Sequence, residues 1–147
     1  MNPKIKHQAG FMLLETMVGL LLFSIGILGM VSMLVMSMKA SSEASYRSEA
    51  SYLANQILAQ MWVDRANLTA YALNPTNPVE SCPAGTSASG NANVTNWLLD
   101  VAKIPNGNAL QPQILVDPLN NNTVTVTLCW QSPNTPVHKF VVTAAIN

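Results

Sequence analysis

The pattern of apolar and polar residues divides the chain into an N-terminal stretch that is apolar on every side and a longer part in which apolar and polar residues alternate. From Thr16 to Met38 none of the 23 residues is charged. A helix of this length is roughly 35 Å long, slightly more than the ~30 Å hydrocarbon layer of a bilayer. The pattern therefore predicts a helix able to span a membrane over residues 11–38.

Residues 39–66 carry their apolar side chains on a single helical face. These recur every three or four positions, as in a helix that packs on a core: Ala50, Leu53, Ala54, Ile57, Leu58, Met61 and Trp62. Glu43 and Arg47 fall outside this face, and their spacing predicts an ion pair along the helix. Because no proline interrupts residues 4–74, one helix is expected over about residues 12–65.

The remainder, residues 67–147, is expected to form a globular head. Residues 74–93 are rich in Pro, Gly, Ser, Thr and Asn, which predicts a loop, and residues 94–103 have the apolar spacing of a short helix. Three strand-like runs follow, at residues 114–116, 123–130 and 137–146. We therefore expect three or four antiparallel strands whose apolar face packs on the helix, an α+β fold.

One acidic side chain stands near the start of the apolar segment. Glu15 is the single charged residue of residues 11–38. A carboxylate at the centre of a bilayer costs about 2.5–3.5 kcal/mol even on a mild insertion scale, so an ionisable residue in such a segment suggests a functional site with a partner. Two lysines precede it, but a cut after Gly10 would remove both and expose an amino group on Phe11.

The sequence GFMLLE at residues 10–15 resembles the processing site of type IV prepilins and of their secretion-system relatives, the pseudopilins. In that family a prepilin peptidase cleaves after the glycine and the new N-terminal residue is N-methylated. The glutamate five residues into the mature chain then guides assembly by pairing with a neighbour's amine. The resemblance implies a leader of residues 1–10, cleavage between Gly10 and Phe11, methylation of Phe11 and an assembly role for Glu15.

Within this family the chain looks most like minor pilins of the PilV type. The similarity covers residues 11–30, including LLFSIGILG at residues 21–29, and residues 44–61, and it is weak beyond residue 62. It implies the type IV pilin fold, in which a long N-terminal helix packs on a small antiparallel sheet. One departure is Ser32, where major pilins often have a helix-bending proline, so a major-pilin role is disfavoured.

The positions of cations and cysteines predict how the chain is oriented. Lys4 and Lys6 precede the apolar segment, whereas Cys82 and Cys129 follow it. By the positive-inside rule the N-terminus lies in the cytoplasm and the head lies outside, where oxidising conditions permit a disulfide between the two cysteines. The resemblance then implies the bacterial inner membrane as the first location and the pilus at the cell surface as the second.

The composition offers little for catalysis. Loss of the leader removes His7 and leaves His138, for which a surface position is expected, and the sequence contains no phosphate-binding glycine loop and no cluster of metal ligands. We therefore expect no enzyme activity, no metal and no cofactor. Loss of the leader also leaves five Lys and Arg against seven acids, which is too few cations for non-specific binding of nucleic acid.

The function implied by the resemblance is that of a structural or priming minor pilin that supports pilus assembly, twitching motility and adhesion. Its partners would be prepilin peptidase, the inner membrane, the assembly machinery, the major pilin and other minor pilins. Two other functions stay open: a minor pseudopilin of a type II secretion system, and a pilus-tip adhesin or DNA-binding subunit. The last would use the loop at Cys82 and the turns around Asn121 and Asn134. A plain membrane anchor and an ordinary secretory signal are further interpretations of the apolar segment.

Overall fold

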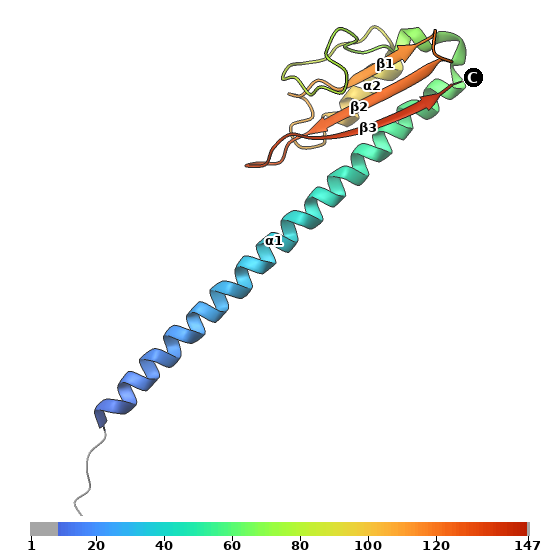
Figure 1. Cartoon of the computed structure of the whole chain (residues 1–147). Coiled ribbons are helices and arrows are strands. Elements are labelled where there is room, and N and C mark those ends of the chain that lie inside the picture. The colour runs from blue at the N-terminus through green and yellow to red at the C-terminus, as the bar shows by residue number, and fades with distance from the viewer. Residues whose placement is uncertain (1–8, 147) are drawn as a thin grey trace, which may run out of the picture. The chain divides into compact units, whose positions relative to one another are not determined.

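The computed structural model describes residues 9–146, which form two compact units that meet at Ser41 and Ser42. We call them the N-terminal unit and the C-terminal unit. The expected leader, apart from its last two residues, lies outside the described residues, and so do Lys4, Lys6 and His7. The elements in chain order (Figure 1) are α1 (Ala9–Val63), the 3-10 helix η1 (Arg65–Tyr71), α2 (Ala92–Val101), β1 (Gln113–Asp117), β2 (Thr123–Trp130) and β3 (His138–Ala145).

The predicted long helix is confirmed in α1, which begins three residues earlier and ends two residues earlier than the pattern indicated. The helix continues through Ser32, whose hydroxyl donates a hydrogen bond to the Leu28 carbonyl oxygen at 3.0 Å. The three glycines within the apolar stretch do not interrupt it either. Serine at this position therefore leaves the helix intact.

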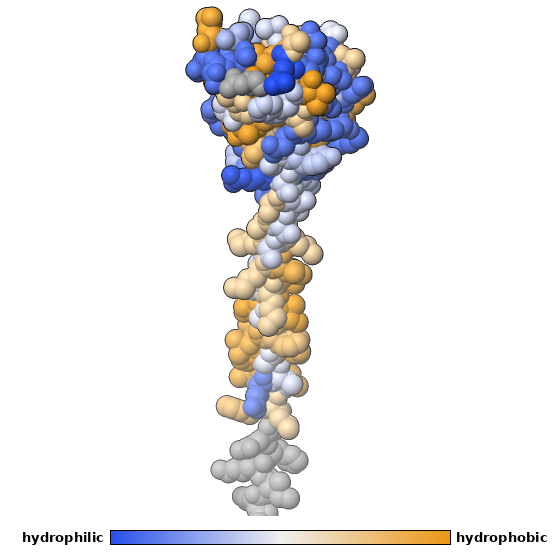
Figure 2. Space-filling view, turned by 90° about the vertical axis from the view of Figure 1, so that its right-hand side faces the viewer, coloured by the Kyte–Doolittle hydropathy of each residue, from blue (hydrophilic) through white to orange (hydrophobic). Residues whose placement is uncertain are grey.

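Every side chain of residues 11–41 is exposed, and apolar groups cover most of the N-terminal unit in the face shown in Figure 2. By length and composition alone, α1 is able to cross a membrane. A core helix of a soluble protein can meet the same criterion, but none of the most apolar window of α1 is buried. The apolar surface of this segment is thus left for lipid or for another chain to cover.

The C-terminal unit is built on a three-stranded antiparallel sheet in the order β1-β2-β3, which confirms the α+β class. The predicted alternation in β2 places Val124, Val126 and Leu128 on one face, and all three are fully buried. That face packs on the apolar face of α1 and on α2 (Figure 1), from which the Trp97 indole donates a hydrogen bond to the Leu53 carbonyl oxygen at 2.8 Å. Helix and sheet therefore share one core.

Asn91 supplies the cap that starts α2. Its side-chain oxygen accepts hydrogen bonds from the backbone amides of Asn93 and Val94, at 2.8 and 3.4 Å. Such a cap satisfies amide donors that the first turn of a helix leaves unpaired. The helix consequently begins at Ala92, two residues before the predicted start.

One predicted core residue is placed differently. Trp62 was assigned to the buried face of α1, but its side chain is 46% exposed, whereas the neighbouring Met61 is fully buried. Successive helical residues are turned by about 100°, so a residue adjacent to the centre of the buried face lies at its margin. The prediction for Trp62 was wrong for this reason, and α1 ends one residue later.

Candidate functional site

The predicted processing and assembly residues all lie in the first two turns of α1. Gly10 and Phe11 follow directly after Ala9, where the helix begins, so the expected cleavage point has helical backbone. The Phe11 side chain is 78% exposed, and that of Glu15 is exposed as well. Residues four apart lie one above the other on a helix, which puts Phe11 and Glu15 on neighbouring turns of one face.

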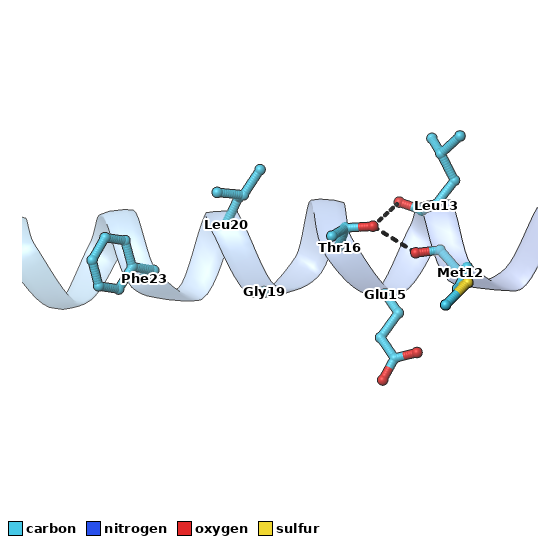
Figure 3. Close-up of a pocket in the computed structure, with 7 residues that line it drawn as sticks. All are labelled: Met12, Leu13, Glu15, Thr16, Gly19, Leu20 and Phe23. Carbon is cyan, nitrogen blue, oxygen red and sulfur yellow. Dashed lines mark hydrogen bonds between the residues drawn. The ribbon is translucent and has the colours of Figure 1, made fainter.

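The Glu15 carboxylate has no hydrogen-bond or ion-pair partner among residues 9–146. Figure 3 shows it extending from the helix, away from Thr16. The Thr16 hydroxyl is satisfied locally, because it donates to the carbonyl oxygens of Met12 at 2.5 Å and Leu13 at 3.4 Å. At this end of the helix, Thr16 is therefore satisfied within α1, whereas any partner of Glu15 would have to come from outside the described residues.

A shallow hollow lies beside Glu15. Gly19 lies one turn further along α1, and a side chain built on it would meet no atom within 4 Å. The hollow around it is lined by the residues drawn in Figure 3, namely Met12, Leu13, Glu15, Thr16, Gly19, Leu20 and Phe23. An approaching helix or side chain would therefore find both an open apolar surface and an unpaired carboxylate.

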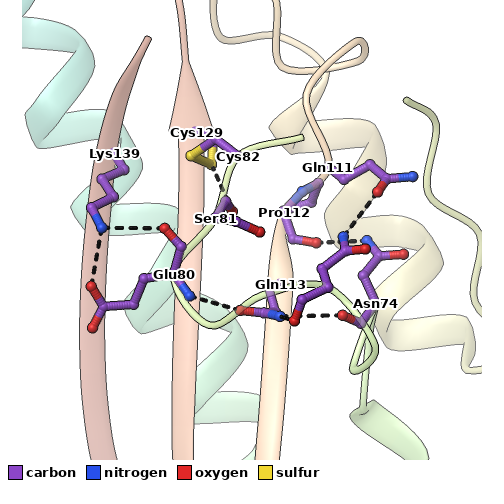
Figure 4. The surroundings of a disulfide bond; sticks show 10 residues. Asn74, Glu80, Ser81, Cys82, Gln111, Pro112, Gln113, Cys129 and Lys139 are labelled. Atoms are coloured by element: carbon purple, nitrogen blue, oxygen red, sulfur yellow. Dashed lines mark hydrogen bonds and ion pairs between the residues drawn. A yellow bond between two sulfur atoms is a disulfide. The ribbon is translucent and has the colours of Figure 1, made fainter. Parts of the chain in front are cut away.

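The disulfide predicted in the head is present between Cys82 and Cys129, with their Cα atoms 5.8 Å apart. It joins the loop that precedes α2 to the face of β2 that points away from the core (Figure 4). In the disputed chain-entropy description, a bridge across 47 positions stabilises the fold by roughly 4 kcal/mol. The disulfide therefore attaches the loop of residues 74–85 to the sheet.

Two further contacts hold the same loop on the sheet. Gln113 is 1% exposed, and its side-chain oxygen accepts a hydrogen bond from the Glu80 backbone amide at 3.1 Å. Its amide nitrogen donates to the carbonyl oxygens of Asn74 and Asn77. Lys139 of β3 forms an ion pair with the Glu80 carboxylate at 3.1 Å. These contacts (Figure 4) make this loop part of the folded unit.

A second cluster of polar side chains, which sequence reasoning missed, connects α1 with the ends of β2 and β3. Glu43 accepts hydrogen bonds from the Ser132 hydroxyl at 2.7 Å and from the Trp130 indole at 3.2 Å. The His138 Nε2 atom lies 3.5 Å from the same carboxylate, and the Trp130 and His138 rings are stacked with centroids 5.7 Å apart. The hydrogen bond from Ser132 is the largest cause that lowers the pKa of Glu43 below 4.5. The hydrogen bond from Trp130 and the charge interaction with His138 act in the same direction, and burial acts in the opposite direction.

Two expectations are corrected by this cluster. The ion pair predicted between Glu43 and Arg47 is absent among the described residues, because the Glu43 carboxylate turns toward the sheet instead. The His138 side chain is 35% exposed and faces Glu43, so it is not a plain surface histidine. Neither placement is readable from local spacing, since 87 or more positions separate Glu43 from Trp130 and Ser132.

The order of contacts in this cluster determines its chemistry. A serine nucleophile needs its hydroxyl proton to pass to a base such as histidine. Here the Ser132 hydroxyl donates to the Glu43 carboxylate, and the imidazole of His138 approaches the other oxygen of the same carboxylate. The carboxylate therefore lies between the serine hydroxyl and the imidazole. In this arrangement Glu43 connects α1 with β2, with β3 and with the loop that carries Ser132.

The two turns named as possible contact sites have the backbone expected of turns. Asn121 and Asn134 both adopt a left-handed conformation, with φ of 54° and 61°. Asparagine tolerates this region better than most residues. Among the described residues no group of three or more His, Cys, Asp and Glu side chains is arranged to hold a metal ion.

Comparisons of the chain with protein-family models, with curated proteins and with solved structures find no match.

Proposed function

We propose that this chain is a membrane-anchored subunit of a type IV pilin filament, and specifically a minor pilin with the type IV pilin fold. The observation that carries the proposal is the carboxylate of Glu15, which has no partner among the described residues and lies in an exposed stretch, residues 11–38, that has no other charge. The resemblance at residues 10–15 and the disulfide-linked α+β unit support it. The chain would act by assembling with other subunits, without catalysis and without a cofactor.

In this mechanism the partner of Glu15 is an amine. Cleavage after Gly10 leaves a new amino group on Phe11, one helical turn before Glu15. Within a bilayer an uncompensated carboxylate is costly, and the amine of a neighbouring subunit offsets that cost. The charge pair then selects subunits in one register, because a shift of the helices along each other would separate the two groups.

Close approach of the apolar helices would complete the assembly. Gly19, Gly26 and Gly29 all have open space where a side chain would be. Small residues allow helices in a membrane to pack closely, which increases van der Waals contact. The C-terminal unit has its own core and its own disulfide, and would stay outside the membrane as a folded domain.

The test is Glu15→Gln in the full chain, expressed in its native host. This substitution keeps the shape of the side chain and removes its charge. We expect normal amounts of the variant in the membrane fraction and at least tenfold less in sheared surface fibres, since loss of one member of a buried ion pair typically costs about 3–5 kcal/mol. Met17→Leu, an apolar exchange within the same exposed segment, is the matched control and should leave both amounts unchanged.

Wild-type amounts of the Glu15→Gln chain in the fibres would contradict the proposed mechanism. N-terminal sequencing of the mature protein gives an independent check. The proposal requires a chain that begins at methylated Phe11 and retains residues 11–38. A secretory signal would leave a product without this segment. Absence of the wild-type protein from surface fibres, together with loss of protein secretion in a deletion strain, would favour the pseudopilin.

A further inference from the structure

We infer that Glu43, Trp130, Ser132 and His138 form an acid-sensitive latch, which holds the first two turns of the C-terminal unit's helix on the sheet and releases them while the rest of the unit stays folded. This goes beyond the proposed function, because nothing in the assembly role of Glu15 requires it. The inference rests on three features: where the buried part of α1 begins, how Glu43 is held, and which charged groups lie near it.

The first feature is the sparse attachment of residues 42–49. Along α1, Ala50 is the first fully buried residue, and the buried face continues from there to Met61. Before Ala50, within the C-terminal unit, the side chains of Glu43 and Tyr46 are half-buried and the others are exposed. Tyr46 packs against the edge of the core. In these two helical turns, Glu43 and Tyr46 are therefore the residues whose side chains are partly buried against the rest of the unit, while the exposed Glu49 carboxylate acts on Lys103 through its charge.

The second feature is that all partners of Glu43 lie at one end of the sheet. Trp130 ends β2, His138 begins β3, and the two are paired directly in the register. Ser132 lies two residues beyond Trp130 and makes the shortest hydrogen bond of the cluster, 2.7 Å. One carboxylate thus connects α1 with both strands and with the turn between them.

The third feature is the charge around the latch. His138 on β3 is the titratable group that faces Glu43, and the other two partners are neutral donors. On α1 itself, Arg47 lies one turn further on and makes no ion pair with Glu43 in the described structure. Lys139, the next residue of β3, points to the opposite face of the sheet and pairs with Glu80. The contacts of Trp130, Ser132 and His138 with α1 thus all converge on the Glu43 carboxylate.

The direction of the pH effect follows from the hydrogen bonds. Hydrogen bonds from Ser132 and Trp130 stabilise the charged carboxylate and lower the pKa of Glu43 in the folded state. A lowered pKa contributes stability that is present above the ordinary value of 4.5 and is lost as the pH falls through the folded value. The latch is thus closed at neutral pH and opens as the pH falls through the lowered pKa of Glu43, which lies below 4.5. After opening, α1 is attached to the sheet from Ala50 onward.

The two tryptophan indoles provide a built-in comparison. Trp130 donates its indole N–H to the Glu43 carboxylate, whereas Trp97 donates its own to the Leu53 carbonyl oxygen, which does not titrate. NMR of the full chain in detergent micelles, with signals assigned through Trp→Phe variants, reports the exchange of each indole proton with water. When the pH falls from 7 through the lowered pKa of Glu43, we expect, after correction for intrinsic exchange, an increase of about tenfold at Trp130 and no change at Trp97.

Release of the helix has a separate readout. Nuclear Overhauser contacts between the Tyr46 ring and core protons should be present at pH 7 and disappear once the pH has fallen through the lowered pKa of Glu43. Glu43→Gln should show fast Trp130 exchange already at pH 7, with no further change in acid. Glu49→Gln is the matched control: this exposed carboxylate on the same helix acts on Lys103 and not on the latch, so the exchange of the Trp130 indole should be that of the wild type.

Three results would overturn the inference. The first is slow exchange at Trp130 throughout the titration of the wild type, which does not depend on any variant folding. The second is simultaneous loss of protection at Trp130 and Trp97, which would indicate global unfolding. The third is persistence of the Tyr46 contacts in acid, which would show that the helix stays in place when the carboxylate is neutral.

Discussion

The two units of this chain differ in where their apolar side chains lie. In the N-terminal unit the apolar side chains of residues 11–38 are all exposed, and the structure of the segment is determined by hydrogen bonds along its own helix. In the C-terminal unit the apolar side chains meet in one core to which α1, α2 and the sheet contribute. The C-terminal unit therefore has a core of its own, whereas the apolar surface of the N-terminal unit is left uncovered by the described residues.

A matched pair of leucine truncations tests the difference between the two units most directly. Leu128 is fully buried and Leu21 is 60% exposed. Leu128→Ala should lower the free energy of unfolding of the C-terminal unit by about 2–5 kcal/mol, because it removes buried contacts and leaves a cavity. Leu21→Ala should leave that free energy unchanged. Chemical denaturation followed by tryptophan fluorescence measures both, and equal effects would refute the division into two independent units.

A pair of glycine substitutions gives the next largest effect. A methyl group at Gly107 would press on the Val101 backbone oxygen and the Ile104 side chain, whereas one at Gly26 would meet open space. Gly107→Ala should destabilise the C-terminal unit by about 1–3 kcal/mol through overpacking. Gly26→Ala should favour the helix by about 1 kcal/mol, as alanine does relative to glycine.

Thermal unfolding measures the first of these effects and circular dichroism in micelles the second. If the proposed helix packing uses Gly26, the same substitution should also reduce recovery in fibres. Full recovery together with a more stable helix would mean that subunits do not approach each other at this position.

The smallest effect is expected for hydroxyl and amide groups that bond within a helix. Asn91→Ala removes the cap of α2 and should cost about 1 kcal/mol. Thr16→Ala removes a hydroxyl that donates hydrogen bonds to carbonyl oxygens of its own helix. The substitution should change the helicity of the N-terminal unit by less than the error of the measurement. A clear loss of helicity in Thr16→Ala would show that the hydroxyl has a partner outside the described structure.

Local pattern was sufficient to predict most elements of the chain. The predicted boundaries of β2 are confirmed at both ends, because alternation of Val or Leu with Thr over this stretch leaves one register that buries the apolar set. The long helix was readable from the absence of proline, and the cysteine pair from the expected compartment. For Gly10, Phe11 and Glu15 the structure gives positions, while their roles stay predictions.

Local pattern was insufficient wherever a side chain is positioned by residues distant in sequence. Glu43 has a nearby cation four residues away, and helical spacing favoured that pair. The structure instead satisfies its carboxylate through groups on β2, β3 and the connecting turn. These groups come close only once the sheet has formed on the helix. Trp130 at the end of one predicted strand and His138 near the start of the next gave no sign of this in the sequence.

The place of β3 at the edge of the sheet has a consequence for crowded conditions. An edge strand offers unpaired backbone groups to any other extended chain, and can seed aggregation. Lys139 is the second residue of this strand, and its charge opposes the stacking of identical strands in register, since the lysines would then face each other. C-terminal units brought close together would therefore be discouraged from joining through this strand.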